Sequence, residues 1–114
     1  MGSSQSQPRH AVWQAVKKRR LVLRTEARQD LEQAVAWYEV QLPDLGRQFR
    51  VEVYRTFDNV IARPELYPKS RVATRKAVLR RFPYLIFYLV ETNRIVVVAV
   101  FHAKRDQDEL TRRP

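Results

Sequence analysis

The sequence predicts an α+β domain in which an N-terminal helical hairpin packs on a small antiparallel sheet. Apolar residues recur at helical spacing from Ala27 to Leu42, and again from Leu45 to Ile61. Two long apolar runs, 84–91 and 94–102, then flank a two-residue connection, which is typical of a β-hairpin. With 114 residues, the chain has room for one domain and one modest core.

The boundaries of the two helices follow from capping and breaking residues. Thr25 is the expected N-cap of the first helix, and Glu26 lies in its first turn, where the helix dipole favours an acid. Pro43 ends this helix, Asp44 is the expected N-cap of the second, and Pro64 ends the second. Because two or three residues join the helices, we expect them to be antiparallel.

Four segments are expected to be strands. Residues 21–23 form a short apolar run before the first helix, and residues 77–81 alternate weakly after a basic loop. The runs 84–91 and 94–102 are the longest, and Thr92-Asn93 between them is the expected hairpin turn.

Two-residue turns would pair Tyr84 with Phe101, Ile86 with Ala99, Tyr88 with Val97 and Val78 with Phe87. Side-chain alternation then defines two faces. The face expected to pack on the helices carries Val78, Leu85, Phe87, Leu89, Val96, Val98 and Val100. The opposite face carries Arg81, Tyr84, Ile86, Tyr88, Val97 and Phe101, and its phenols need polar partners. One helical hairpin cannot cover both faces, so we expect another chain or the N-terminal segment to cover the second.

Composition narrows the function classes. The chain has no cysteine, which excludes disulfides, thiol catalysis and cysteine-based zinc sites and favours a reducing compartment. Its apolar runs are too short to span a membrane and its N-terminus lacks a signal-peptide core, so a cytoplasmic location is expected. The only histidines are His10 and His102, so neither a metal site nor a cofactor is expected.

The net charge of +10 is unevenly distributed. Residues 1–24 carry six bases and no acid, and residues 63–81 carry seven bases and one acid, whereas the helical section 25–62 has a net charge of −3. This pattern indicates an acidic or polyanionic partner, although a basic surface can also serve solubility alone. We expect residues 1–20 to be a flexible basic extension and residues 21–114 to form the domain.

The order and spacing of several motifs resemble the RelE/ParE toxin superfamily of bacterial toxin–antitoxin modules. The motifs run from Glu26-Ala27-Arg28 and Ala36-Trp37-Tyr38-Glu39 through Leu45-Gly46-Arg47-Gln48-Phe49, Pro64-Glu65-Leu66-Tyr67-Pro68 and Arg80-Arg81-Phe82-Pro83-Tyr84 to Arg105-Asp106. The resemblance implies a growth-inhibiting toxin that an antitoxin of the ParD or RelB kind neutralises with an extended, acidic C-terminal segment. We expect this segment to bind Arg81, Tyr84, Ile86, Tyr88, Val97 and Phe101.

The resemblance leaves two mechanisms open. In a ribosome-dependent mRNA endonuclease, His102 would be the acid, with Lys76, Arg81 and Arg105 supplying positive charge. The nucleases of the family carry a base where this chain has Val78, an arginine where it has Leu85, and often an aromatic or hydroxyl-bearing residue where it has Leu110. The match is therefore better to the ParE branch, whose members inhibit DNA gyrase and have no established catalytic residues. In that case Arg81, Arg105, Arg112 and Arg113 are the expected target-binding residues, and His102 is a hydrogen-bonded structural residue.

Overall fold

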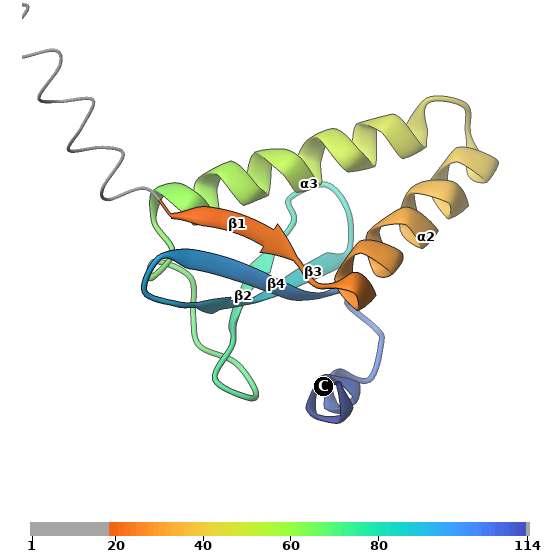
Figure 1. Ribbon diagram of the computed structural model, residues 1–114. Coiled ribbons are helices and arrows are strands. Elements are labelled where there is room, and N and C mark those ends of the chain that lie inside the picture. Colours follow the sequence, from red (N-terminus) through yellow and green to blue (C-terminus); the bar gives the residue numbers. More distant parts are fainter. Residues whose placement is uncertain (1–18, 114) are drawn as a thin grey trace, which may run out of the picture.

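The computed structural model describes residues 19–113, so the predicted extension 1–20 lies almost entirely outside the described part. Two helices cover one face of a four-stranded sheet (Figure 1), which confirms the α+β fold class. The elements are β1 (Arg20–Leu23), α2 (Thr25–Gln41), α3 (Leu45–Ala62), β2 (Arg75–Val78), β3 (Tyr84–Val90), β4 (Arg94–His102) and the 3-10 helix η1 (Gln107–Arg112). No helix among these residues is both long and apolar enough to cross a membrane.

The sheet is mixed rather than purely antiparallel. Its strand order is β1-β4-β3-β2, and the β2–β3 and β3–β4 pairs are antiparallel as predicted. β1 instead runs parallel to β4, from the pair Arg20 and Arg94 to the pair Leu23 and Val97. Parallel neighbours need a long crossover connection. Here the chain from β1 to the rest of the sheet passes through the helical hairpin.

The tight turn between α2 and α3 depends on a side chain of α2. Asp44 is the N-cap of α3, as predicted, but it has a left-handed backbone (φ 75°) and its carboxylate does not cap the helix. Glu39 does so instead, because its two carboxylate oxygens accept hydrogen bonds from the N–H groups of Asp44 (2.8 Å) and Gly46 (2.9 Å). A Cβ atom at Gly46 would lie 2.6 Å from the carbonyl oxygen of Val35, so only glycine permits this approach of the helices.

A β-bulge changes the predicted register of the long hairpin. Tyr88 pairs with Val97 as predicted, but Tyr84 pairs with His102 and Ile86 with Val100, one residue away from the prediction. The register shifts between Phe87 and Tyr88 because β4 has one additional residue there. An additional residue reverses the alternation of side chains beyond it. Odd-numbered and even-numbered residues of β4 therefore exchange faces across the bulge.

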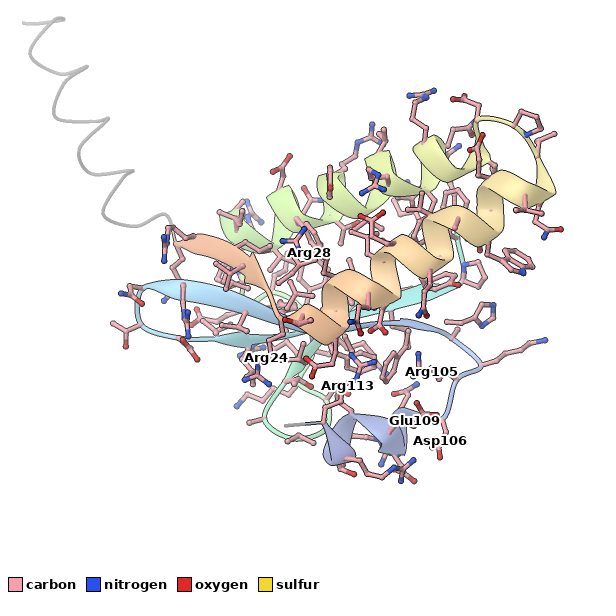
Figure 2. The ribbon with its side chains drawn as sticks, turned by 45° about the vertical axis from the view of Figure 1, so that its right-hand side comes forward. Arg24, Arg28, Arg105, Asp106, Glu109 and Arg113 are labelled. Atoms are coloured by element: carbon pink, nitrogen blue, oxygen red, sulfur yellow. The ribbon has the colours of Figure 1, made fainter. Side chains whose placement is uncertain are left out.

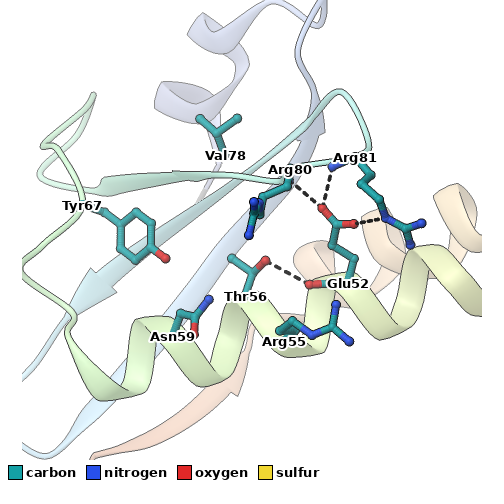
Figure 3. A pocket seen from close by; sticks show the side chains of 8 residues that line it. All are labelled: Glu52, Arg55, Thr56, Asn59, Tyr67, Val78, Arg80 and Arg81. Carbon is teal, nitrogen blue, oxygen red and sulfur yellow. Dashed lines mark hydrogen bonds and ion pairs between the residues drawn. The ribbon is translucent and has the colours of Figure 1, made fainter.

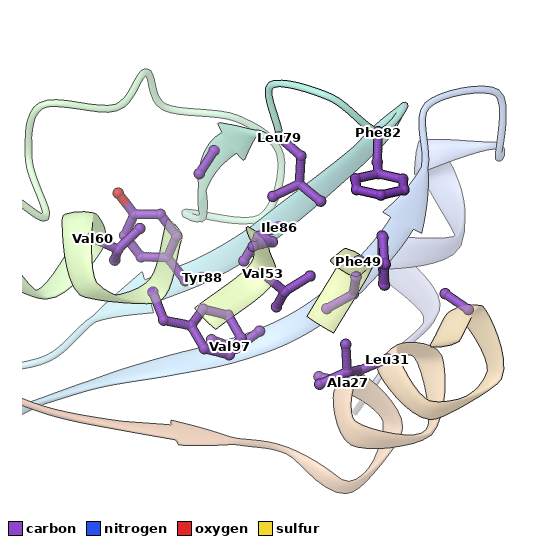
Figure 4. Close-up of a cluster of buried hydrophobic side chains, with 14 of the residues drawn as sticks. Ala27, Leu31, Phe49, Val53, Val60, Leu79, Phe82, Ile86, Tyr88 and Val97 are labelled. Carbon is purple, nitrogen blue, oxygen red and sulfur yellow. The ribbon is translucent and has the colours of Figure 1, made fainter. Parts of the chain in front are cut away.

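The prediction of which sheet face meets the helices is wrong. The helices pack on the face that carries Tyr88, Ile86 and Val97, together with Ala77, Ile95 and Val100 (Figure 4). The distal face carries Leu85, Phe87, Val96, Val98, Ala99 and Phe101, and Leu110 of η1 packs against it. Both faces are apolar, so alternation alone could not identify the one that meets the helices.

The edge strand β2 is also displaced from its prediction. It spans 75–78 instead of 77–81, and Val78 pairs with Leu85 rather than with Phe87. The Leu79 N–H group still donates to the carbonyl oxygen of Tyr84 (3.0 Å). Residues 80–83 then form a loop that is anchored to α3.

Candidate functional site: an arginine-lined groove and the C-terminal arginines

The loop after β2 is held on α3 by one carboxylate. Oε2 of Glu52 accepts hydrogen bonds from the backbone N–H groups of Arg80 (2.6 Å) and Arg81 (2.8 Å), and Oε1 accepts from Nε of Arg81 (3.1 Å). Glu52 is only 5% exposed, whereas the Arg81 side chain is 60% exposed. The buried acid thus fixes the backbone of the loop while both arginines remain at the surface.

The environment of Glu52 favours its charged form. Burial alone would raise the pKa of the Glu52 carboxyl, but the N–H groups of Arg81 and Arg80 and the Arg81 guanidinium outweigh burial and lower that pKa. The loop is therefore attached to α3 by an ionised acid at neutral pH.

A groove of about 460 Å³ lies between α3 and the edge of the sheet. α3 contributes Arg55, Thr56 and Asn59 beside Glu52, and the other wall comes from Val78, Arg80 and Arg81 with Tyr67 at one end (Figure 3). Its three arginines and one glutamate give the groove a net charge of +2. Such a site favours an anionic ligand or an acidic segment of a partner.

A second cluster of charges fastens the C-terminal part of the chain to the sheet. The Arg113 guanidinium donates two hydrogen bonds to the Asp30 carboxylate (2.8 and 2.9 Å) and a third to the carbonyl oxygen of Val98 (2.8 Å). Asp30 is 8% exposed and also accepts from the backbone N–H of Val100 (3.0 Å). α2, β4 and the end of the chain therefore meet at one buried carboxylate.

Arg105 and Arg113 both lie over the ring of Phe101, at 4.2 and 4.7 Å from its centroid. Arg105 also pairs with Glu109 of η1 (2.7 Å), and its own guanidinium lies 3.8 Å from Asp30 (Figure 2). Together with Leu110, these two arginines cover part of the distal face. Arg113 is therefore largely buried, whereas Arg105 is held by these contacts but stays at the surface.

The four residues proposed to bind the target thus differ in how accessible they are. The side chains of Arg81, Arg112 and Arg105 are 60%, 66% and 38% exposed, and within residues 19–113 the ion pair of Arg112 is a long contact of 3.9 Å with Asp106. The Arg113 side chain is 15% exposed. In this structure Arg81 and Arg112 can reach a partner directly, whereas Arg113 holds η1 in place.

The structure does not bring together the four residues of the predicted nuclease set. His102 pairs with Tyr84, whose ring packs on Tyr38 of α2, so both lie on the helix side of the sheet. Arg81 is also on this side, where it contacts α3. Lys76 pairs with Phe87 on the distal face. Arg105 lies over Phe101, but its backbone N–H donates to the carbonyl oxygen of His102 (2.9 Å) and its guanidinium lies 3.8 Å from Asp30 of α2, so Lys76 is the member that lies apart.

His102 is a hydrogen-bonded residue at the end of its strand. Its Nδ1 accepts from the backbone N–H of Lys104 (3.0 Å), and its ring meets that of Tyr84 edge-on at 5.2 Å between centroids. These contacts agree with the structural interpretation of this histidine. Within residues 19–113, no group of three or more histidine, aspartate or glutamate side chains could hold a metal ion.

The face expected to bind an antitoxin is not available at its centre. Ile86, Tyr88 and Val97 are fully buried by the chain's own helices, so the prediction that they form an uncovered surface is wrong. The Tyr88 hydroxyl finds its polar partner inside the molecule, where it donates to the carbonyl oxygen of Pro64 (2.6 Å), and burial raises its pKa to about 12. Phe101 is also fully buried, but on the distal face, because the bulge reverses the alternation of β4. Of the predicted set, Arg81 and the half-buried Tyr84 remain at the surface.

Sequence reasoning missed Glu52 and Asp30 as organising residues. Both occupy positions within the apolar stripe of their helix, since Glu52 lies beside Phe49 and Val53, and Asp30 beside Ala27 and Leu31. A charged residue inside an apolar stripe is rarely buried unless it is paired. This rule could have identified Glu52 and Asp30 from the sequence as buried, paired carboxylates.

Comparison with known proteins places this geometry in context. A family model described as "ParE toxin of type II toxin-antitoxin system, parDE" matches residues 21–107. Among solved structures, a chain of the chromosomal ParDE TA system from P. aeruginosa is similar, with a TM-score of 0.67 and 18% identity over 75% of this chain and 97% of that one. At this identity the likeness concerns the fold. No curated protein matches the chain significantly.

Proposed function

This chain belongs to the ParE toxin family of type II toxin–antitoxin systems, and on that premise we propose that it stops growth by inhibiting DNA gyrase until an antitoxin neutralises it. The observation that carries the choice of target is the separation of the nuclease set. Lys76 pairs with Phe87 on the distal face, whereas His102 and Arg81 lie on the helix side of the sheet. Acid–base cleavage of RNA needs such groups around one phosphate.

Inhibition by binding needs fewer precisely placed groups than RNA cleavage does. It requires an accessible cationic surface, and the exposed Arg81 and Arg112 are the residues we propose for contact with the target. Arg105 and Arg113 contribute by keeping η1, which carries Arg112, against the sheet. No cofactor takes part in this proposal.

The antitoxin is the second partner in the proposal. A net charge of +10 favours a neutralising protein with an acidic segment. Because the centre of the helix-side sheet face is buried, this segment has to bind at the surface, where Arg81 and Tyr84 remain accessible.

The purified chain is expected to block DNA supercoiling by gyrase, and its expression should stop growth unless the antitoxin gene from the same module is expressed with it. His102→Ala should leave both effects unchanged, because the ring has a structural role in this proposal. Primer extension on mRNA after induction should reveal no new cuts at codon positions. Cuts that disappear in His102→Ala, with supercoiling unaffected by the wild-type chain, would replace gyrase with the ribosome as the target.

A further inference from the structure

A cluster of arginines lies at the end of the sheet where β1 begins. Arg20 and Arg94 are the first residues of β1 and β4, and they are direct partners in the parallel pairing of these strands. Two residues further on, Val22 and Val96 are also partners and lie on the distal face, so alternation places the Arg20 and Arg94 side chains side by side on that face. Like charges that face each other across two strands destabilise the pair. The fold alone therefore gives no reason for two arginines at these positions.

Arg19 adds a third guanidinium at the same end of the sheet. Its Nε donates to the carbonyl oxygen of Thr92 (3.3 Å), in the turn between β3 and β4 that lies beside the start of β1 (Figure 1). Glu91 pairs with Nε of Arg94 (2.7 Å), so the three arginines and this acid have a net charge of +2. The terminal nitrogens of Arg19 and Arg94, and the whole guanidinium of Arg20, have no partner in the described part of the chain. We call these three arginines the β1 cluster.

The sequence continues this positive charge toward the N-terminus. Lys17 and Lys18 directly precede Arg19, so four consecutive bases lead into β1. Residues 1–24 contain six bases and no acid. A short stretch with so many bases suits a ligand that carries regularly spaced negative charges, and the phosphates along a nucleic acid are such a series.

We propose that the β1 cluster, continued by Lys17 and Lys18, binds the phosphate backbone of duplex DNA without reading its sequence. Arg20 and Arg94 lie on neighbouring strands, which are about 4.8 Å apart, so their guanidinium groups can hold one phosphate between them. A phosphate bound there replaces their mutual repulsion with charge-assisted hydrogen bonds to a common anion. This activity goes beyond the proposed function. Because gyrase acts on DNA, binding to the same DNA would raise the effective concentration of the chain near that target.

The surroundings of the β1 cluster favour duplex DNA over other acidic partners. Binding to an anionic membrane requires apolar side chains that insert beside the bases. None of the large exposed apolar side chains in the described part of the chain belongs to β1, to β4 or to the turn between β3 and β4. The same lack disfavours an acidic protein, since protein interfaces depend on apolar or aromatic anchors. Single-stranded nucleic acid requires exposed aromatic rings for stacking, and the exposed Trp37 and Tyr54 lie on the helices.

The test follows the fluorescence anisotropy of a labelled DNA duplex of mixed sequence, titrated with the full chain at several salt concentrations. Arg19→Gln with Arg20→Gln should weaken binding by about tenfold or more at about 0.1 M salt. It should also reduce the slope of log K against log salt by about two, since each lost phosphate contact removes about one. A duplex with the same bases in scrambled order should bind equally well, because phosphate contacts carry no sequence information. Circular dichroism checks that the variant is folded.

Arg55→Gln with Arg80→Gln is the matched control, because it removes the same charge from two exposed arginines of the groove beside the other edge strand, β2. At about 0.1 M salt, charges more than about 10 Å apart are largely screened, so this variant should keep its affinity within about threefold and its salt slope nearly unchanged. Equal losses in the two double variants would overturn the proposal, since binding would then follow net charge alone. An unchanged salt slope in Arg19→Gln with Arg20→Gln would also overturn it.

Two competitors test the choice of ligand. Polyglutamate, and vesicles of phosphatidylserine and phosphatidylcholine, should displace the duplex only at about tenfold or more higher concentrations of negative charge. Displacement by either one at an equal concentration of charge would overturn the proposal in favour of an acidic polypeptide or a membrane surface.

Gyrase is absent from these titrations, so this inference and the proposed function are tested separately. A chain that blocks supercoiling but does not bind the duplex contradicts only the DNA inference. A chain that binds the duplex without blocking supercoiling contradicts only the proposed target.

Discussion

The carboxylate of Asp30 joins three parts of the chain that are far apart in sequence. It accepts from the backbone of Val100 and from both terminal nitrogens of Arg113, and it is nearly buried. Its loss would leave a poorly exposed guanidinium without its partner, which is the costly way to break an ion pair. This site is therefore expected to be among the most sensitive single positions in the protein.

Asp30→Asn should lower the free energy of unfolding by about 2–3 kcal/mol, because the amide keeps one acceptor oxygen but loses the charge that pairs with Arg113. Urea unfolding followed by circular dichroism measures the change. Glu91→Gln is the matched control, since its pair with Arg94 is solvent-exposed and should contribute less than about 0.5 kcal/mol. Equal effects of the two variants would contradict the role given to Asp30.

The helical hairpin illustrates what the sequence could predict at the level of an element. Periodicity identified both helices, and proline and aspartate placed the turn at 43–44, as observed. The actual cap of α3, however, comes from Glu39 of the neighbouring helix. A capping interaction between helices leaves no local pattern in the sequence, so only the three-dimensional structure reveals it.

Gly46→Ala should destabilise the protein by about 1–3 kcal/mol, because the new methyl group would lie 2.6 Å from the Val35 carbonyl oxygen and would push the helices apart. This cost should exceed the gain in helix propensity that alanine brings elsewhere. Thermal unfolding is the measurement. Val51→Ala, at an exposed position of the same helix, should have little effect, and a stabilised Gly46→Ala variant would show that the helices can separate freely.

The strands show why register is harder to predict than element type. The bounds of β4 and the turn at 92–93 were predicted from apolar runs, and β4 is observed at 94–102. The bulge next to Phe87 has no marker in a run of valines, yet it separates Val100 from Leu85 and Phe87, and Phe101 from Tyr88 and Val97, the residues expected to share their faces. η1 was missed because its sequence is mainly polar and only Leu110 is buried.

At the scale of the whole molecule, several carboxylates link stability to pH. A hydrogen bond from Arg50 lowers the pKa of Glu32, and hydrogen bonds from Arg47 and Gln48 lower that of Asp44. The pKa of Glu52 is also lowered, although burial opposes the change. In each case the unfolded chain binds protons more readily than the folded one, so stability increases with pH through this range.

The free energy of unfolding should therefore be highest above about pH 4–4.5, the range of an unperturbed carboxyl, and should fall as the pH drops through the lower pKa values of the folded state. Urea titrations at a series of pH values measure this slope. Glu52→Gln removes one contributing group, so the variant should be less stable at neutral pH and should lose less stability on acidification. A slope unchanged by Glu52→Gln would contradict the ionised, loop-holding role of that carboxylate.

The parallel pairing of β1 with β4 also bears on how the protein is made. Arg20 leaves the ribosome well before its partner Arg94, and the contact between Asp30 and Arg113 closes later still. Contacts so distant in sequence slow folding. β1 cannot pair with β4 until nearly the whole chain has been synthesised. Chains cut short by premature termination should therefore accumulate as unfinished, protease-sensitive species.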